Sequence, residues 1–114
     1  MRKIQVSAGN VTVIATLNST STANAIWGAL PIQSTANLWG EEVYFEVPVK
    51  MGEDNAQPEV PSGTVAYWPA GHCLCLFFGQ KPYSPVNVVG EIEGDANVLA
   101  SVRDGDKVTV DRLE

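Results

Sequence analysis

The sequence has few of the side chains on which metal sites and nucleophilic catalysis depend. Among its 114 residues are one histidine, His72, and two cysteines, Cys73 and Cys75. A structural zinc site needs about four such ligands, so we expect no metal and no cofactor. The sequence also lacks a G-x-x-x-x-G-K-[ST] phosphate loop and a G-x-S-x-G nucleophile turn. No motif therefore predicts a catalytic residue.

Positive charge and long apolar runs are scarce too. Seven Lys and Arg stand against thirteen Asp and Glu, giving a net charge of -6. Nucleic acids and anionic membranes attract basic proteins, so we expect neither as a partner. No stretch approaches the ~20 apolar residues of a membrane span, and polar residues interrupt any signal-peptide core after Lys3. We expect a cytoplasmic protein.

The only histidine and the two cysteines occupy one extended run. Cys73 and Cys75 are two residues apart, so they point to the same side of a strand, where a disulfide between them would be strained. His72 and Cys73 are neighbours whose side chains diverge, which excludes a nucleophile and base pair. We expect a reduced thiol pair and a histidine at a turn.

The sequence is rich in apolar residues, 45% of the total, and most of them alternate with polar ones. A period of two indicates strands, and turn residues separate the runs. The exception is a run with helical spacing, Ala23, Ile26, Trp27 and Leu30, preceded by possible caps and closed by Pro31. Strands are expected over residues 4–8, 11–17, 41–49, 64–69, 72–79, 86–94 and 107–113.

These elements predict a mainly β domain over residues 1–114, with one main helix and one short helix capped by Asp95. Many short, evenly spaced strands favour a closed barrel of about eight strands, because closure removes exposed edges. The segment 72–79 is apolar on both faces, so we expect it at the centre of the fold. Residues 31–38 are interpreted as a polar connector and residues 50–63 as a long surface loop.

Three carboxylates, Glu41, Glu42 and Glu46, lie in one predicted strand, and two interpretations are open for them. They are solvated charges on the outer face, or Glu42 lines a polar groove beside Tyr44. The aromatic residues leave a similar choice, because rings at strand ends pack in a core or form the walls of a ligand site. The aromatic residues concerned are Trp39, Tyr44, Tyr67, Trp68 and Tyr83.

Three segments, NLWGEEVYFEVPV, GTVAYWPAGHCLCLFFG and VNVVGEIEG, occur in this order after two strands and a helix. This arrangement resembles the prokaryotic cyclophilin-like proteins, which share N-x-W-G-x-E-[IV]-Y-F and Y-W-P-x-G-x-x-L-C-L-F-F-G motifs. The resemblance spans nearly the whole chain, although the GQKPYSP segment is shorter than the loop that the family often carries. It implies a barrel of about eight strands and raises the prolyl isomerase activity of true cyclophilins.

Prolyl isomerisation in true cyclophilins depends on an arginine on a strand after the first helix. A fixed cation there stabilises the twisted prolyl amide. Here no Lys or Arg occurs between Lys3 and Lys50, and the corresponding strand carries carboxylates. Arg103 and Arg112 come much later and match no cyclophilin motif.

The sequence therefore favours a non-catalytic binding module for a small molecule or a peptide, with an acidic groove that suits a cationic ligand. The candidate ligand-binding residues are Trp39, Glu42, Tyr44 and Trp68. The alternative is a prolyl isomerase with a site that lacks arginine. A third hypothesis is a subunit whose strand face packs on another protein or on a second copy, which makes a homo-oligomer a possible state.

Overall fold

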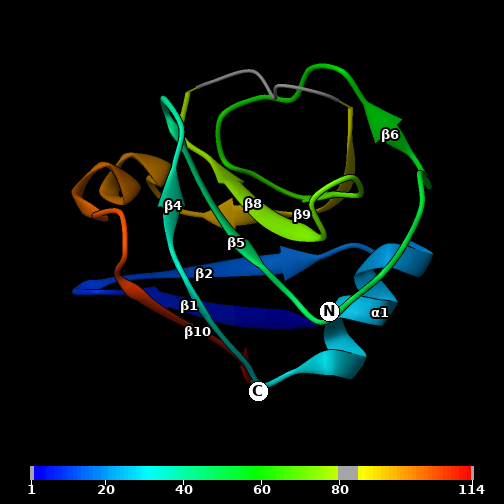
Figure 1. Ribbon diagram of the computed structural model, residues 1–114, viewed down its shortest axis with the longest axis horizontal. Coiled ribbons are helices and arrows are strands. Elements are labelled where there is room, and N and C mark those ends of the chain that lie inside the picture. Colours follow the sequence, from blue (N-terminus) through cyan, green and yellow to red (C-terminus); the bar gives the residue numbers. More distant parts are fainter. Residues whose placement is uncertain (1, 80–84, 114) are drawn as a thin grey trace.

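A computed structural model describes residues 2–79 and 85–113. Within these ranges the chain forms ten strands, one α-helix and one 3-10 helix (Figure 1). In chain order they are β1 (Lys3–Ala8), β2 (Val11–Leu17), α1 (Ser21–Ala29), β3 (Ile32–Thr35), β4 (Asn37–Leu38), β5 (Glu42–Glu46), β6 (Ala56–Gln57), β7 (Thr64–Trp68), β8 (Cys73–Phe77), β9 (Val86–Glu93), η1 (Ala96–Ser101) and β10 (Lys107–Leu113).

The strands form one antiparallel sheet in the order β3-β10-β1-β2-β9-β7-β8-β5-β4, and β6 pairs with β9. The prediction of a closed barrel is wrong, because this path has two ends within the described residues. β3 pairs with β10, whereas β4, which follows it directly, pairs with β5. If the register Asn37 to Tyr44 continued, Gln33 would lie opposite Pro48, which has no N–H to donate to a ladder. The sheet stays open at this point.

Three strands, β3, β4 and β6, were not expected from the sequence. β3 contains one buried apolar residue, Ile32, and β4 and β6 have only two residues each. Stretches this short and polar show no alternation that could be recognised. The other seven strands and both helices confirm the predicted elements, with Asp95 accepting a hydrogen bond from the Asn97 N–H at the start of η1.

The helix α1 lies at one end of the sheet, beside the start of β1 (Figure 1). Its N-cap is Thr20, whose hydroxyl accepts a hydrogen bond from the Ala23 N–H at 3.2 Å. Ala23 and Ile26 are fully buried, as the helical spacing predicts, while Trp27 is only partly buried. The apolar stripe of the helix therefore closes one end of the core. None of the helices in the described ranges is long and apolar enough to cross a membrane.

The inner face of the sheet is apolar along its whole length. Side chains from β1, β2, β3, β5, β7, β8, β9 and β10 meet there with those of α1. The largest polar exception is Tyr67, which is fully buried but donates its hydroxyl to the Val49 carbonyl at 2.5 Å and accepts the Met51 N–H at 3.1 Å. A buried hydroxyl with both partners present adds no unsatisfied group. The central strand β8 is buried throughout, as its double apolar pattern predicts.

The segment from Lys50 to Gly63 is a long surface loop, as expected, and it is anchored to the sheet. The Asp54 carboxylate accepts the N–H and the hydroxyl of Thr22 in the first turn of α1, at 3.2 and 3.0 Å. The Asn87 amide of β9 is fully buried, accepts the Asp54 N–H and donates to the Gly52 carbonyl. These partners are more than thirty residues apart in the sequence, so no local sequence pattern could predict their contacts. We call residues 50–63 the strap.

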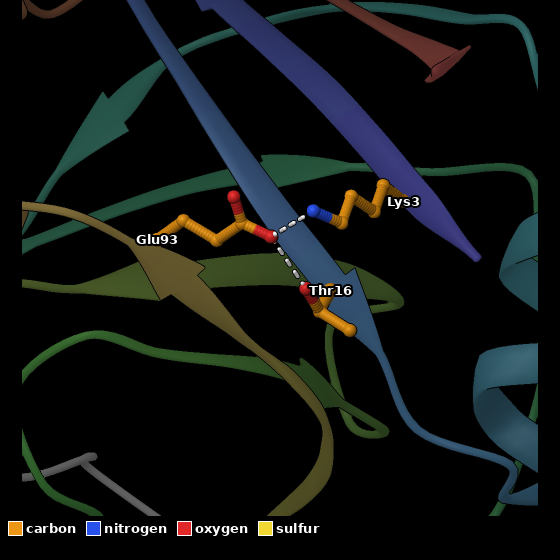
Figure 2. A network of polar contacts seen from close by, with 3 residues as sticks. All are labelled: Lys3, Thr16 and Glu93. Atoms are coloured by element: carbon orange, nitrogen blue, oxygen red, sulfur yellow. Dashed lines mark hydrogen bonds and ion pairs between the residues drawn. The ribbon is translucent and has the colours of Figure 1, made fainter. Parts of the chain in front are cut away.

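The outer face differs along the sheet. Over β1, β2 and β9 it carries an exposed polar cluster, in which the Lys3 ammonium and the Thr16 hydroxyl both contact Oε2 of Glu93 at 2.8 Å (Figure 2). Over β5, β8 and β7 it carries a second apolar cluster of Ala66, Cys73, Cys75, Phe77 and Val86. This second cluster contains the candidate site.

Candidate functional site

The register of the sheet brings the predicted site residues onto one outer surface. Directly opposed residues of antiparallel strands share a face, and Tyr44 lies opposite Cys75, which lies opposite Ala66. The next row contains Cys73 and Trp68, and the row on the other side contains Glu42 and Phe77. We call this surface of β5, β8 and β7 the outer cluster.

Trp39 joins the edge of the outer cluster. It follows β4, and its N–H donates to the Glu42 carbonyl at 3.1 Å, which continues the register of the β4–β5 hairpin. Gly40 has φ +57 and turns the chain between the two strands. The Trp39 side chain is 42% exposed. The four residues predicted from the sequence therefore lie on one face of the sheet, with Trp39 at the rim and Glu42 inside.

Glu42 is the unusual residue of the site. Glu42 is only 7% exposed. For this residue the interpretation as a solvated charge is wrong. Glu41 and Glu46 are exposed, as that interpretation requires. Burial raises the pKa of the Glu42 carboxyl, and the hydrogen bond from the Cys75 thiol opposes this rise. A carboxyl with a raised pKa takes up and releases protons nearer to neutral pH than a solvated one.

The two thiols beside Glu42 are free and buried. Burial raises the pKa of the Cys73 thiol to about 11, with further contributions from the charges of Glu46 and Glu42. The pKa of Cys75 is also raised, first by burial and then by the charge of Glu42. A protonated thiol is a weak nucleophile. The cysteines therefore act as packing groups and, at Cys75, as a hydrogen-bond donor to the carboxyl.

Two aromatic rings border the cluster. Tyr44 and Trp68 are partly buried and meet edge to face, with ring centroids 6.4 Å apart and an interplanar angle of 86°. A Cβ at Gly71 would lie 2.4 Å from the Trp68 ring, so only glycine lets the indole lie over this turn. Val60 of the strap packs against the same cluster. The aromatic wall is thus fixed on one side by a turn and lies close to the strap.

Several members of the cluster were missed by sequence reasoning. Cys75 and Phe77 were expected to be buried, but not to lie beside Glu42. Pairing the 41–49 run with the 72–79 run in antiparallel register would have placed them there, since each run alternates clearly. Tyr67, grouped with the candidate aromatics, faces the inner core instead. Tyr83 and most of the GQKPYSP segment lie outside the described residues.

None of the arginines forms an ion pair with Glu42 within the described residues. The Arg112 guanidinium donates to the Trp27 carbonyl at 2.9 Å and lies 4.7 Å from the centroid of the Trp27 ring, at the C-terminal end of α1. Arg2 contacts the same ring at 5.4 Å. Arg103 is exposed at the start of the turn that leads to Asp106. Within residues 2–79 and 85–113 no three His, Cys, Asp or Glu side chains group into a possible metal site.

Comparison with known proteins agrees with this architecture. A family model described as Cyclophilin-like matches residues 2–111. The chain belongs to the Cyclophilin-like family. No curated protein matches the sequence significantly.

Two solved structures share the fold of this family member. The solution structure of the hypothetical protein AF2241 from Archaeoglobus fulgidus is 37% identical, with a TM-score of 0.86 over 98% of this chain and 95% of that one. The structure of McbB in complex with tryptophan is 20% identical, with a TM-score of 0.79 over 95% of this chain and 44% of that one. The second likeness establishes a shared fold alone.

Proposed function

We propose that this Cyclophilin-like chain is a binding module that holds a small amine-bearing molecule or peptide at the outer cluster, against Glu42, Tyr44, Trp68 and the exposed indole of Trp39. The observation that carries the proposal is the buried Glu42 carboxyl, which has no cation beside it in the described ranges and a pKa raised by burial. Buried carboxylates are usually paired, and a ligand ammonium would supply the missing charge.

The surroundings of Glu42 favour a ligand that combines an amine with a flat apolar group. Phe77 lies directly opposite Glu42, and Tyr44 is the next residue on the same face of β5. The Tyr44 ring in turn meets Trp68, which lies in the row of Cys73 and Glu46. Such a mixture of apolar walls and one convergent polar group is typical of small-molecule sites. The McbB structure, which has this fold, was determined in complex with tryptophan, a molecule of this chemical type, and this supports the proposal by analogy.

The proposal is tested by titrating the protein with tryptamine and, as a matched ligand, indole-3-propionate. Both have an indole ring, but only tryptamine has an ammonium group. We expect tryptamine to bind at least about tenfold more tightly, a difference of about 1.4 kcal/mol. Binding should also release protons near the raised pKa of Glu42, because an adjacent cation stabilises the carboxylate. Calorimetry in two buffers of different ionisation enthalpy measures this release.

Substitutions at the outer cluster test whether tryptamine binds beside Glu42. Glu42→Gln and Tyr44→Phe should weaken tryptamine binding, and Glu42→Gln should abolish proton release. Glu46→Gln is the matched control, because Glu46 is exposed on the same face of the same strand. Equal losses in Glu42→Gln and Glu46→Gln would show that only the general negative charge matters and would contradict the assignment.

Prolyl isomerisation provides the contrasting outcome. Because the strand on which true cyclophilins carry an arginine has carboxylates here, we expect no catalysis above background with a proline peptide. Turnover that is abolished by Glu42→Gln or Tyr44→Phe would replace the binding proposal with an arginine-independent isomerase.

A further inference from the structure

The opening of the sheet between β3 and the end of β5 forms a polar groove. Its volume is about 680 Å³, and its lining includes Gln33, Ser34, Glu46, Pro48, Lys50 and His72. We call it the seam groove. It lies between two strand edges that would pair in a closed barrel, and it is distinct from the group of residues assigned to the outer cluster.

The side of the seam groove formed by β3 has backbone groups without a strand partner. Ala36 directs its N–H to the Asp106 carbonyl at 2.8 Å, and its carbonyl accepts the Gly105 N–H at 2.9 Å. Backbone direction alternates along a strand, so Ser34 and Ile32 direct theirs toward β10, with which they are in register. Gln33 and Thr35 therefore direct their N–H and carbonyl groups away from β10. Gln33 lines the groove, whereas the Thr35 carbonyl accepts the side-chain amide of Asn37 at 3.4 Å.

The side formed by β5 cannot complete the ladder. The Glu46 carbonyl, which would accept the Thr35 N–H in a continued register, instead accepts the Ser34 hydroxyl at 2.7 Å. The Val47 N–H is used on the other side of the strand, by the His72 carbonyl at 2.9 Å. Pro48, opposite Gln33, has no N–H. The Ser34 hydroxyl thus joins the two edges near Glu46, whereas at Gln33 and Pro48 the edges do not pair.

The charged side chains at the seam groove indicate which kind of ligand it favours. Lys50 is exposed at the groove and forms no ion pair with any residue in 2–79 or 85–113. His72, at a turn with φ +54, presents a second nitrogen-bearing side chain to the same groove. Glu46 adds one negative charge on the β5 wall. An acidic group near Lys50 is therefore favoured, and it should lie at the Lys50 end rather than beside Glu46.

We propose that the seam groove binds an extended peptide segment, which pairs with the backbone of β3 at Gln33 and directs an acidic side chain toward Lys50. Strand addition to an exposed sheet edge is a general mode of peptide recognition, in which main-chain hydrogen bonds give affinity and side-chain contacts give specificity. This site is independent of the binding proposed at Glu42, because it uses different residues, at the opposite end of β5.

The test is an NMR titration of the 15N-labelled protein with the capped peptide acetyl-Thr-Val-Glu-Val-Thr-amide. We expect shift changes at the amides of Gln33 and Thr35, together with at least tenfold slower hydrogen exchange at Gln33. A peptide with Lys in place of its Glu should bind several-fold more weakly. Absence of shifts at these amides with millimolar peptide, or shifts confined to Tyr44 and Cys75, would overturn the proposal.

Backbone variants separate pairing from side-chain effects. Gln33→Pro removes the N–H that points into the groove, and an edge strand tolerates proline at such a position, so binding should weaken at least tenfold with the thermal midpoint nearly unchanged. Gln33→Ala is the matched control and should retain binding. Equal weakening in both variants would assign the effect to the glutamine side chain and overturn strand pairing.

Pro48→Val tests the same idea from the opposite wall. The new N–H lies opposite Gln33, so the two edges can pair, which should raise the thermal midpoint and abolish peptide binding. A variant that still binds the peptide with wild-type affinity contradicts the proposal. Sedimentation at increasing protein concentration provides a further outcome: association that Gln33→Pro abolishes would identify a second copy as the occupant in place of a separate peptide.

Discussion

The outer face of the sheet carries a carboxylate in each of two regions, Glu42 on β5 and Glu93 on β9, and the surroundings of the two differ. Glu93 is exposed, and the hydrogen bonds from Lys3 and Thr16 lower its pKa. Glu42 lies among Cys75, Phe77 and Tyr44, and burial raises its pKa. The pKa of the same chemical group on the same face of one sheet therefore moves in opposite directions.

The difference between the two regions follows from what covers them. Lys3 and Glu93, on the surface of β1 and β9, are exposed to solvent and bonded to each other, so they need no cover. Figure 2 shows their contact together with that of Thr16. The outer cluster is apolar, and Val60 of the strap packs against it. An ionisable group in an apolar surface without a cation contributes poorly to stability. Within the described residues Glu42 therefore has no ion pair that would stabilise the fold, whereas Glu93 has two local partners.

The first prediction measures how much the outer cluster contributes to folding. Phe77 is fully buried although it lies on the outer face. We expect Phe77→Ala to lower the free energy of unfolding by about 3–5 kcal/mol, as for other large-to-small changes at buried positions. Gln5→Ala, on the outer face of β1, is the control and should change it by less than about 0.5 kcal/mol. Urea denaturation measures both values. Similar small losses in the two variants would show that the outer cluster is not a second core.

The second prediction concerns the pH dependence that Glu42 produces. Its raised pKa means that the folded state holds its proton more strongly than the unfolded state, whose carboxyl titrates near the ordinary value of 4.5. Stability is therefore lost as the pH rises through the folded-state pKa, and the penalty is absent below about 4.5. Glu42→Gln should be more stable than the wild type at pH 7, because the amide has no charge to desolvate.

Thermal melts of the wild type and Glu42→Gln between pH 4 and pH 8 check this expectation. The two curves should separate as the pH rises and meet at the acidic end. Glu46→Gln should follow the wild type throughout, because Glu46 is exposed. A Glu42→Gln variant that is less stable than the wild type at pH 7 would mean that the carboxylate has a stabilising partner, which contradicts its role as an unpaired ligand-binding group.

Much of the architecture could be predicted because alternation reports which faces are buried. The hairpin of β1 and β2, the helix α1 and the central strand β8 all follow from apolar spacing, and their burial agrees with it. The open seam could not be predicted in this way. It depends on one missing N–H, at Pro48, and on the register that brings this residue opposite Gln33. Periodicity predicts which side chains share a face of a strand, but it does not predict which other strand pairs with it.

The candidate site was predicted in part for the same reason. Alternation placed Glu42 and Tyr44 on one side of a strand, and the register adds Cys75 and Trp68 to that side. The burial of Glu42 depends on long-range packing, because Phe77 and Cys75 of β8 lie beside it. Neighbours more than thirty residues away in the sequence leave no local pattern, so a solvated outer face was the simpler expectation.

The third and smallest effect is expected at Glu93, the exposed counterpart of Glu42. Its pKa is lowered chiefly by the hydrogen bond from Lys3 and then by that from Thr16, so the folded state binds its proton less strongly than the unfolded state. The stabilisation is present above about pH 4.5 and is lost as the pH falls through the lowered folded-state pKa. Glu93→Gln should therefore be slightly less stable at pH 7 and equal to the wild type at low pH, the reverse of Glu42→Gln.

Because both partners are exposed, added salt should screen the ion pair between Lys3 and Glu93 and shrink this difference in stability. The stabilisation by Glu42→Gln should persist in salt. Thermal melts of the two variants at low and high salt compare the regions directly, and an equal response to salt would mean that Glu42 is as solvated as Glu93.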